Sequence, residues 1–322
     1  MAYLRKALKY FFGFLFLLTG IFACINYPIS AEPKALARLS DTLNIRRNLE
    51  AIIYTPQSRN SGNIAVLDSV CDYIRKEFAK HTNTVTIQEF EVEKRTYKNV
   101  IASFGPENAE RIIVGAHYDV CGEQNGADDN ASGVAGILEL ARLLKNKDLK
   151  YRIDLVAYSL EEPPFFRTNN MGSYIHASYL SQHKIPVKGM ISLEMIGYFS
   201  DEENSQDYPV GLLKWFYGNK GNFITVVQKP LNGSFSRDFK KEFFRTNSIP
   251  AKSFKAPPFF GGIDLSDHLN YWKFGYSAVM ITNTAFFRNA NYHTTGDKFS
   301  TLNIPRMGLV IDGVFRTLTE LK

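Results

Sequence analysis

The chain has 322 residues, of which 45% are hydrophobic, and this is enough for one large α/β domain or two small ones. Its formal net charge is +6, and Arg5, Lys6 and Lys9 near the N-terminus supply three of these charges, which leaves +3 for the remainder. No later run of Lys or Arg is long enough to follow a phosphate backbone, so we do not expect nucleic-acid binding.

The first 31 residues are predicted to direct export. Basic residues precede an apolar stretch from Tyr10 to Cys24, and so short a span is more typical of a signal peptide than of a membrane-spanning helix, which needs roughly 20 apolar residues. An uncleaved anchor is one alternative. A lipoprotein signal with a lipidated Cys24 is another, although bulky Phe22 stands where a small residue is usual. In each case the body is expected outside the cytoplasm, periplasmic or extracellular, with membrane association possible through this segment.

Only two cysteines, Cys71 and Cys121, follow the export segment, which is too few for a disulfide framework. Cys71 lies in a helical pattern and is predicted to be a buried small residue. Cys121 lies four residues beyond His117 and invites the interpretation of a metal ligand. We predict a structural role instead, because a lone thiol is unusual in an oxygen-rich site.

Residues 32–322 are predicted to form a single domain. Helical periodicity covers residues 35–50 and 64–80, and alternating strands follow at 84–92 and 97–105. Short apolar runs, of the kind buried on both faces, occur at 111–118, 151–160, 187–196 and 276–284, and helical segments are predicted at 131–147, 172–182, 268–274 and 307–321. Strands that alternate with helices indicate an α/β fold with a mixed, largely parallel central sheet flanked by helices on both faces.

Polar residues cluster where these buried strands end, which is the edge at which parallel sheets gather ligands. They are His117, Asp119, Asp128, Asp129, Glu161, Glu162, Glu194 and His293. Two histidines with several carboxylates suit Zn²⁺ or a similar divalent ion. A paired-metal site needs one carboxylate shared between the ions, one histidine and one further carboxylate for each ion, and a free carboxylate to accept a proton from the bridging water.

Five motifs in this order, GAHYDV, GADDNASG, SLEEPPFF, SLEMIG and YHTTGD, resemble those of the M28 zinc exopeptidases, the co-catalytic aminopeptidases. The resemblance extends from about Leu36 to the C-terminus. It implies the zinc-exopeptidase fold, two zinc ions per chain and peptide substrates with a free α-amino group. The ligands that it implies are His117 and Glu194 for the first zinc, Glu162 and His293 for the second, and Asp129 as the bridge.

The resemblance also implies roles for residues beside the ligands. Glu161 corresponds to the general base, which takes a proton from the bridging water and later delivers it to the leaving amine. Asp119 corresponds to the partner that orients the ring of His117. Relatives often carry a cis peptide after the bridging aspartate, so we expect a cis bond between Asp129 and Asn130. Asp128 is expected to be solvated or hydrogen-bonded locally.

Two positions depart from the family pattern. Glu194 replaces the usual aspartate; its longer side chain can still ligate, or it points away and leaves the first site weak or empty. Ile263 stands where some members carry a tyrosine that stabilises the oxyanion, three residues before a Ser-Asp-His sequence. His268 could replace that donor or contact the substrate, or Asp267 and His268 could simply cap the following helix.

The tetrapeptide PPFF occurs twice, at residues 163–166 and 257–260, and each copy flanks a candidate catalytic segment. Pro-Pro can simply mark a turn. We predict that the four phenylalanines form the wall of an apolar pocket for the first side chain of the substrate. They are Phe165, Phe166, Phe259 and Phe260.

The sequence therefore favours an exported zinc-dependent aminopeptidase. One alternative is a glutaminyl-cyclase-like acyltransferase with a single zinc, but those relatives lack the histidine of the His-x-Asp motif, and here both His117 and Asp119 are present. A second alternative is a non-catalytic binding ectodomain. Such relatives lose ligands or the base, whereas this chain retains all of them.

Overall fold

The computed structural model describes residues 2–258 and 261–321, and within them nine strands form one sheet in the order β1-β8-β7-β9-β6-β4-β5-β3-β2. The strands are β1 (Ser30–Ala31), β2 (Val85–Val92), β3 (Arg95–Phe104), β4 (Arg111–His117), β5 (Arg152–Tyr158), β6 (Val187–Glu194), β7 (Ile224–Gln228), β8 (Ala251–Lys255) and β9 (Ala278–Thr282). The four central strands β5, β4, β6 and β9 are mutually parallel, while antiparallel pairs join them to β3 and to β7. The predicted mixed sheet with a parallel centre is confirmed.

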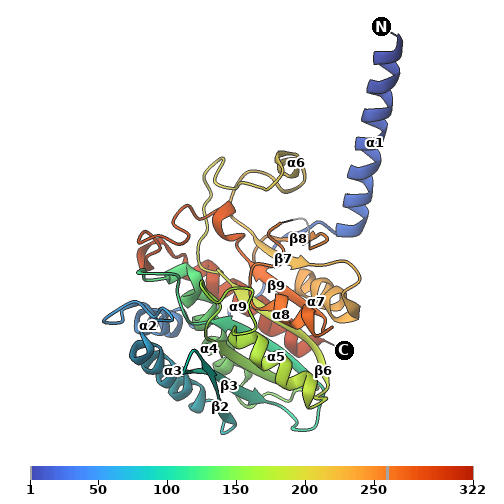
Figure 1. The fold of residues 1–322 in the computed structure, drawn as a ribbon. Coiled ribbons are helices and arrows are strands. Elements are labelled where there is room, and N and C mark those ends of the chain that lie inside the picture. Colours follow the sequence, from blue (N-terminus) through green and yellow to red (C-terminus); the bar gives the residue numbers. More distant parts are fainter. Residues whose placement is uncertain (1, 259–260, 322) are drawn as a thin grey trace.

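Helices cover both faces of this sheet (Figure 1), as predicted. One face carries α2 (Thr42–Ile53), α3 (Ile64–Ala79), α4 (Gly133–Leu144), α7 (Gly233–Thr246) and α9 (Ile304–Glu320), and the other carries α5 (Gly172–Gln182) and α8 (His268–Lys273). The larger apolar core lies under the first group, and a smaller one lies under α5 and α8. The central strands are therefore buried on both faces, which explains their unbroken apolar sequences.

The helix boundaries differ from the sequence prediction at one clear point. The helix expected over residues 35–50 begins only at Thr42, because the Asp41 side chain accepts hydrogen bonds from the backbone N–H groups of Leu43 and Asn44 and so caps α2. The sequence analysis also missed β1, β7, α7 and β8. These elements extend the sheet beyond β9 and form the part of the body that lies nearest the N-terminal helix.

The N-terminal helix α1 (Ala2–Asn26) projects from the body (Figure 1). Its segment Lys6–Asn26 is long and apolar enough to cross a membrane, and the body covers none of the most apolar 18-residue stretch within it. A signal sequence near an N-terminus meets the same criteria of length and composition.

Candidate metal centre

The carboxyl ends of three adjacent central strands deliver most of the predicted site residues to one place. His117 ends β4, Glu161 and Glu162 follow the end of β5 after two intervening residues, and Glu194 ends β6. Asp129 lies in the turn between β4 and α4, and His293 comes from the loop after β9. Because these strands are parallel neighbours, their ends lie side by side, and residues far apart in sequence meet there.

Asp129 lies between the two histidines and offers a different oxygen to each. Its Oδ1 is 3.3 Å from His117 Nε2, and its Oδ2 is 3.2 Å from His293 Nε2. The Asp129 side chain is 2% exposed. Burial alone would raise its pKa, but contacts with His117 and His293 outweigh burial and hold the pKa of Asp129 well below its usual value. The carboxylate is therefore ionised and shared, as a bridging ligand must be.

A further carboxylate completes each half of the cluster. Glu194 Oε2 lies 3.5 Å from His117 Nε2, and Glu162 Oε2 lies 3.1 Å from His293 Nε2. Two ligand atoms that each bind a tetrahedral zinc at about 2.0–2.1 Å are separated by about 3.3–3.4 Å, which is close to these spacings. Glu194 points into the cluster, so the alternative in which it turns away from the site does not describe this structure.

The donor atoms themselves also fit a metal centre. Among the described residues, the buried atoms without a hydrogen-bond partner include the Nε2 atoms of His117 and His293, Asp129 Oδ2 and Glu162 Oε1. Buried polar atoms are normally paired, so four unpaired ones facing a common region require a partner. Imidazole nitrogens and carboxylate oxygens are zinc ligands, and the donor set is therefore suited to that ion.

Glu161 lies beside the cluster, with its Oε2 3.9 Å from His117 Nε2. Burial raises the pKa of Glu161 well above its usual value, and although His117 lowers it, neighbouring Glu162 and Glu194 raise it further. A carboxyl group of raised pKa can hold a proton near neutral pH, which a group that both accepts and returns a proton requires.

The turn that carries Asp129 is held by neighbours on both sides. The peptide bond between Asp129 and Asn130 is cis, as the family resemblance led us to expect. The Asn130 side chain donates to the Leu193 carbonyl and accepts from the N–H groups of Gly133 and Met195. A Cβ atom on Gly133 would lie 2.4 Å from Asn130 Oδ1, so only glycine allows this close approach.

The expectation for Asp128 is wrong, because its carboxylate is neither solvated nor bonded only locally. It is completely buried and accepts hydrogen bonds from segments far along the chain. Its Oδ1 accepts from the N–H groups of Gly197 and Tyr198, and its Oδ2 accepts from the side-chain amides of Asn283 and Asn289. Asp128 therefore ties together the loops after β6 and β9, while Asp129 faces the metal ligands.

The sequence analysis missed Asp297, which orients both aspartates. Its two carboxylate oxygens accept from the backbone N–H groups of Asp128 and Asp129 at 2.9 and 3.0 Å. Burial raises the pKa of Asp297 to about 7, and nearby Asp128 adds to this rise. The motif YHTTGD contains this residue, but only the folded chain reveals that it accepts hydrogen bonds from the backbone of the GADDNASG turn.

The sequence analysis also missed the buried residue Arg59, which supports the loop between His117 and Asp129. Its guanidinium donates to the carbonyls of Tyr118, Asn125 and Gly126. These contacts hold the segment that connects His117 to Asp129. No local sequence pattern distinguishes this arginine from a surface one, because these three partners are backbone atoms some 60 residues away in sequence, and only the Ile52 carbonyl lies nearby in the chain.

Asp119 lies behind the cluster and contacts three residues of the site. Its Oδ1 is 3.5 Å from His117 Nδ1, while the nearest acceptor for that nitrogen is the main-chain carbonyl of Asp119 itself, at 3.2 Å. Its two carboxylate oxygens accept from the backbone N–H groups of Glu161 and Glu162. Asp119 thus holds the peptide that carries both glutamates as well as approaching the histidine ring.

The Ser-Asp-His sequence lies behind Glu194. Ser266 donates to Glu194 Oε2 at 2.7 Å, a contact that the sequence analysis did not foresee. His268 is fully buried with its Nε2 2.7 Å from the Ile263 carbonyl. Asp267 is also buried, and burial raises its pKa to about 7. The Asp267 side chain makes no capping hydrogen bond to α8, so the simple capping interpretation does not hold.

The structure divides the predicted phenylalanine pocket. Phe165 belongs to the hydrophobic core and packs against Tyr97, whereas Phe166 lines the cleft over the metal ligands. Phe259 and Phe260 lie outside the described residues. Phe165 is therefore a core residue, and the sequence misplaced it because an apolar residue after a turn can face either way.

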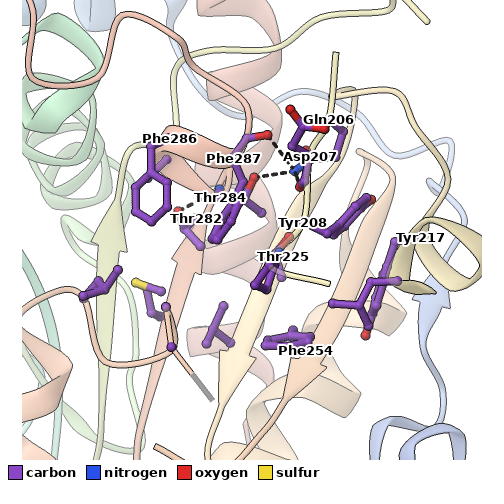
Figure 2. A pocket seen from close by; sticks show the side chains of 18 of the residues that line it. Gln206, Asp207, Tyr208, Tyr217, Thr225, Phe254, Thr282, Thr284, Phe286 and Phe287 are labelled. Carbon is purple, nitrogen blue, oxygen red and sulfur yellow. Dashed lines mark hydrogen bonds between the residues drawn. The ribbon is translucent and has the colours of Figure 1, made fainter. Parts of the chain in front are cut away.

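A different cavity adjoins the centre (Figure 2), with a volume of about 80 Å³. Its lining includes apolar and aromatic side chains from β7, β8, β9 and the loop after β6, among them Leu213, Tyr217, Phe223, Phe254 and Met280. Glu194 and Leu265 line both this cavity and the metal cleft. The cavity and the cleft therefore lie on either side of these two residues.

Cys121 lies closer to the centre than its predicted structural role implied. Its sulfur, a Glu162 oxygen and a His293 ring nitrogen all lie within 4.8 Å of one another. The side chain is partly exposed and makes no disulfide. The sequence showed only a lone thiol, because the loop that carries His293 comes more than 170 residues later.

The fold is that of the zinc exopeptidases. The LapA aminopeptidase of Legionella pneumophila is similar to this chain with a TM-score of 0.66 at 21% identity, over 88% of this chain and 73% of LapA. A glutaminyl cyclase from Fimbriiglobus ruber is similar with a TM-score of 0.64 at 18% identity, over 89% of this chain and 97% of the cyclase. The shared architecture thus serves aminopeptidases as well as cyclases, and the residues of the site must distinguish them.

The chain belongs to peptidase family M28, because the profile of that family matches residues 99–318. It is 39% identical to the uncharacterized protein YfbL of Escherichia coli, over 98% of this chain and 99% of that protein. It is 27% identical to a leucine aminopeptidase 1 of Metarhizium robertsii, over 88% of this chain and 70% of the fungal protein. The protein is thus a zinc-dependent peptidase of the M28 aminopeptidase type.

Proposed function

We propose that this protein is an exported aminopeptidase with two zinc ions per chain, which removes N-terminal residues from peptides. The observation that carries the proposal is the position of Asp129, whose two carboxylate oxygens face two different histidines. His117 and Glu194 would hold one zinc, and His293 and Glu162 the other. Residues 32–322, the part of the chain that follows the predicted export segment, would act as one catalytic domain outside the cytoplasm.

When bound, such ions would lower the pKa of a shared water and polarise the scissile carbonyl. The chain's own residues supply the proton transfer. Glu161, held by the contact of its N–H group with Asp119, would accept the proton of the attacking water and return it to the leaving amine. Its burial excludes bulk water, so the proton stays available for this second step.

The apolar cavity supports a preference for large apolar N-terminal residues. It opens beside Glu194, and its walls are predominantly apolar and aromatic. Burying a leucine or phenylalanine side chain there would contribute about 1.5–3 kcal/mol relative to water. The curated relatives named leucine aminopeptidase are consistent with this preference.

The decisive experiment compares Glu161→Gln with Glu162→Gln, a matched pair of neighbours on one loop. Both are assayed for zinc per chain and for hydrolysis of aminoacyl anilides that carry Leu, Phe or Ala. Glu161→Gln should keep both ions and lose about 10²–10⁴-fold in kcat, whereas Glu162→Gln should lose the second ion. A fully active Glu161→Gln variant would overturn the mechanism.

A glutaminyl-cyclase-like activity is the second candidate, because cyclases share the fold. The presence of His117 within 3.3 Å of Asp129 favours two ions over one. The same preparations should therefore be given a peptide with an N-terminal glutamine. One zinc per chain together with release of ammonia and a blocked N-terminus would establish the cyclase and exclude the aminopeptidase.

A further inference from the structure

The end of α1 is built into the body instead of leaving it through a free linker. Asn26, its last residue, is completely buried. Its side-chain amide donates to the Lys255 carbonyl at 3.2 Å and accepts from the Lys255 N–H at 2.5 Å. The Asn26 side chain thus pairs with both the N–H group and the carbonyl of the last residue of β8, as the backbone of a neighbouring strand would.

A lysine closes the same junction from the other side. Lys240 of α7 donates to the carbonyls of Asn26 and Tyr27 at 3.2 and 2.9 Å. A positive charge at the carboxyl end of a helix is favourable because the last carbonyls there carry partial negative charge. The chain then continues directly into β1, where Ser30 and Ala31 pair with β8.

Aromatic side chains fasten the preceding helical turn. The ring of Phe22 lies 5.4 Å from Phe216, 6.3 Å from Tyr217 and 6.2 Å from Phe254. Tyr217 and Phe254 also line the apolar cavity beside the metal centre. Cleavage between Phe22 and Asn26, which includes the position before Cys24, would remove this ring from the back of the cavity wall.

The loop that Phe22 touches exposes apolar side chains to solvent. We call residues 207–217 the interfacial loop; it contains η2 (Gly211–Leu213) and α6 (Lys214–Tyr217). Trp215 is 87% exposed, Val210 45% and Leu212 38%. The loop's two charged residues, Asp207 and Lys214, pair with each other at 3.2 Å. The loop therefore offers an apolar surface without net charge.

The position of this loop relative to α1 identifies what could cover it. Figure 1 shows α6 beside the part of α1 that enters the body, and the contact of Phe216 with Phe22 places the two side by side. Because the turn Phe22–Asn26 packs on the body, the free part of this apolar segment is residues 6–21, a helix about 24 Å long, which approaches the roughly 30 Å thickness of a bilayer core. If α1 spans a bilayer, Trp215 then lies where membrane and water meet, a preferred position for tryptophan.

We propose that α1 is a retained membrane anchor and that the interfacial loop binds the outer surface of the same bilayer. The occupant of the exposed apolar surface is thus lipid, continuous with the lipid around α1. Tyr208, Leu213 and Tyr217 of the loop also line the apolar cavity. The cavity would consequently lie close to the membrane, within reach of peptides presented at its surface. The proposal does not depend on the catalytic role assigned to the site.

The first test asks whether the N-terminus is retained. The full chain, carrying a C-terminal tag, is expressed, extracted from membranes with detergent and measured by intact mass and N-terminal sequencing. We expect a chain that still contains all of α1. A mature N-terminus at Cys24, or anywhere between residues 24 and 32, would overturn the proposal.

The second test measures where Trp215 lies. The chain contains two tryptophans, and the other, Trp272, is buried against the carbonyl of Ala278. Full-length protein is reconstituted into phosphatidylcholine vesicles with or without lipid brominated near the headgroup. Trp272→Phe, which leaves Trp215 alone, should lose much of its emission to the brominated lipid, and Trp215→Phe should lose little.

If Trp272→Phe does not fold, the difference between wild type and Trp215→Phe gives the same information. Trp215 emission that is insensitive to brominated lipid but quenched by aqueous acrylamide would show that the loop stays in water, and would overturn the proposed lipid contact. Zinc content and anilide hydrolysis, measured on the same vesicles, report separately on the proposed function.

Discussion

The adjacent aspartates of GADDNASG have different roles: Asp128 joins two loops by hydrogen bonds, and Asp129 faces the candidate metal ligands. The substitution Asp128→Asn tests the first role separately from the second. Asp128 Oδ1 accepts two backbone N–H groups at 2.9 and 3.0 Å, and its Oδ2 accepts two side-chain amides at 2.8 and 3.0 Å. An asparagine has one acceptor oxygen, so its NH₂ group must face one of these pairs of donors. At least two hydrogen bonds are lost, and two buried donors are left without partners.

The magnitude follows from those two contacts. A hydrogen bond to a charged acceptor contributes about 1.5–3 kcal/mol, so the two together amount to about 3–6 kcal/mol, offset in part because the variant no longer buries a charge. A net loss of about 3 kcal/mol should lower the Tm by roughly 4–5 °C for a chain of 322 residues. The zinc content should be unchanged, because no Asp128 oxygen faces the histidines.

The assay is thermal unfolding of the metal-free protein, combined with zinc analysis of the loaded protein, and Asp129→Asn is the matched control. That variant should lose zinc, because its shared carboxylate is replaced by an amide, while the hydrogen bonds that join the loops after β6 and β9 stay intact. The reasoning is refuted if Asp128→Asn loses zinc and leaves the Tm of the metal-free protein unchanged, since Asp128 would then be the bridging residue.

Three further outcomes are expected. Ser266→Ala removes the 2.7 Å hydrogen bond to Glu194 and should weaken zinc binding at the first site by about 10–100-fold, measured by chelator competition; unchanged affinity would show that Ser266 does not orient the ligand. Burial raises the pKa of Glu162 to about 8, and the carboxylates of Asp129 and Glu162, outweighing burial, raise that of His293 to about 10. Both groups hold protons more tightly when folded, so metal-free protein should lose stability from pH 5 to 9, by about 1.4 kcal/mol per pH unit for each extra proton, whereas a Tm that rises over this range would contradict the shifts. Cys121 should be alkylated by iodoacetamide more slowly when zinc is bound than after chelation, as read by peptide mass spectrometry, and equal rates would separate the thiol from the site.

The pattern of apolar runs and polar residues predicted much of the architecture and of the candidate metal centre. Apolar runs separated by helical segments indicated the parallel core, because strands buried on both faces leave a continuous apolar sequence. The polar residues at the ends of those runs could be placed together for the same reason, since parallel strands end at one edge of the sheet. The ligands and the candidate base were therefore recognised by residue type and position.

Other features depend on contacts that the linear sequence does not contain. The burial of Asp128, the grip of Asp297 on the turn and the support from Ser266 all join residues tens to hundreds of positions apart. A local pattern cannot distinguish such side chains from solvated ones. Phe165 was misplaced for the same reason, because it turns into the core, whereas Phe166 lines the cleft over the metal ligands.

The sequence by itself determined that this is an M28-type metallopeptidase with an apolar N-terminal segment, because ligand types, their order and the buried strands are written in the chain. Only the tertiary structure decided which aspartate faces the histidines and which cavity adjoins the centre. It also revealed the junction at Asn26 that leads us to propose a retained anchor. These outcomes depend on which surfaces meet in three dimensions, and buried hydrogen bonds between distant segments fix that choice.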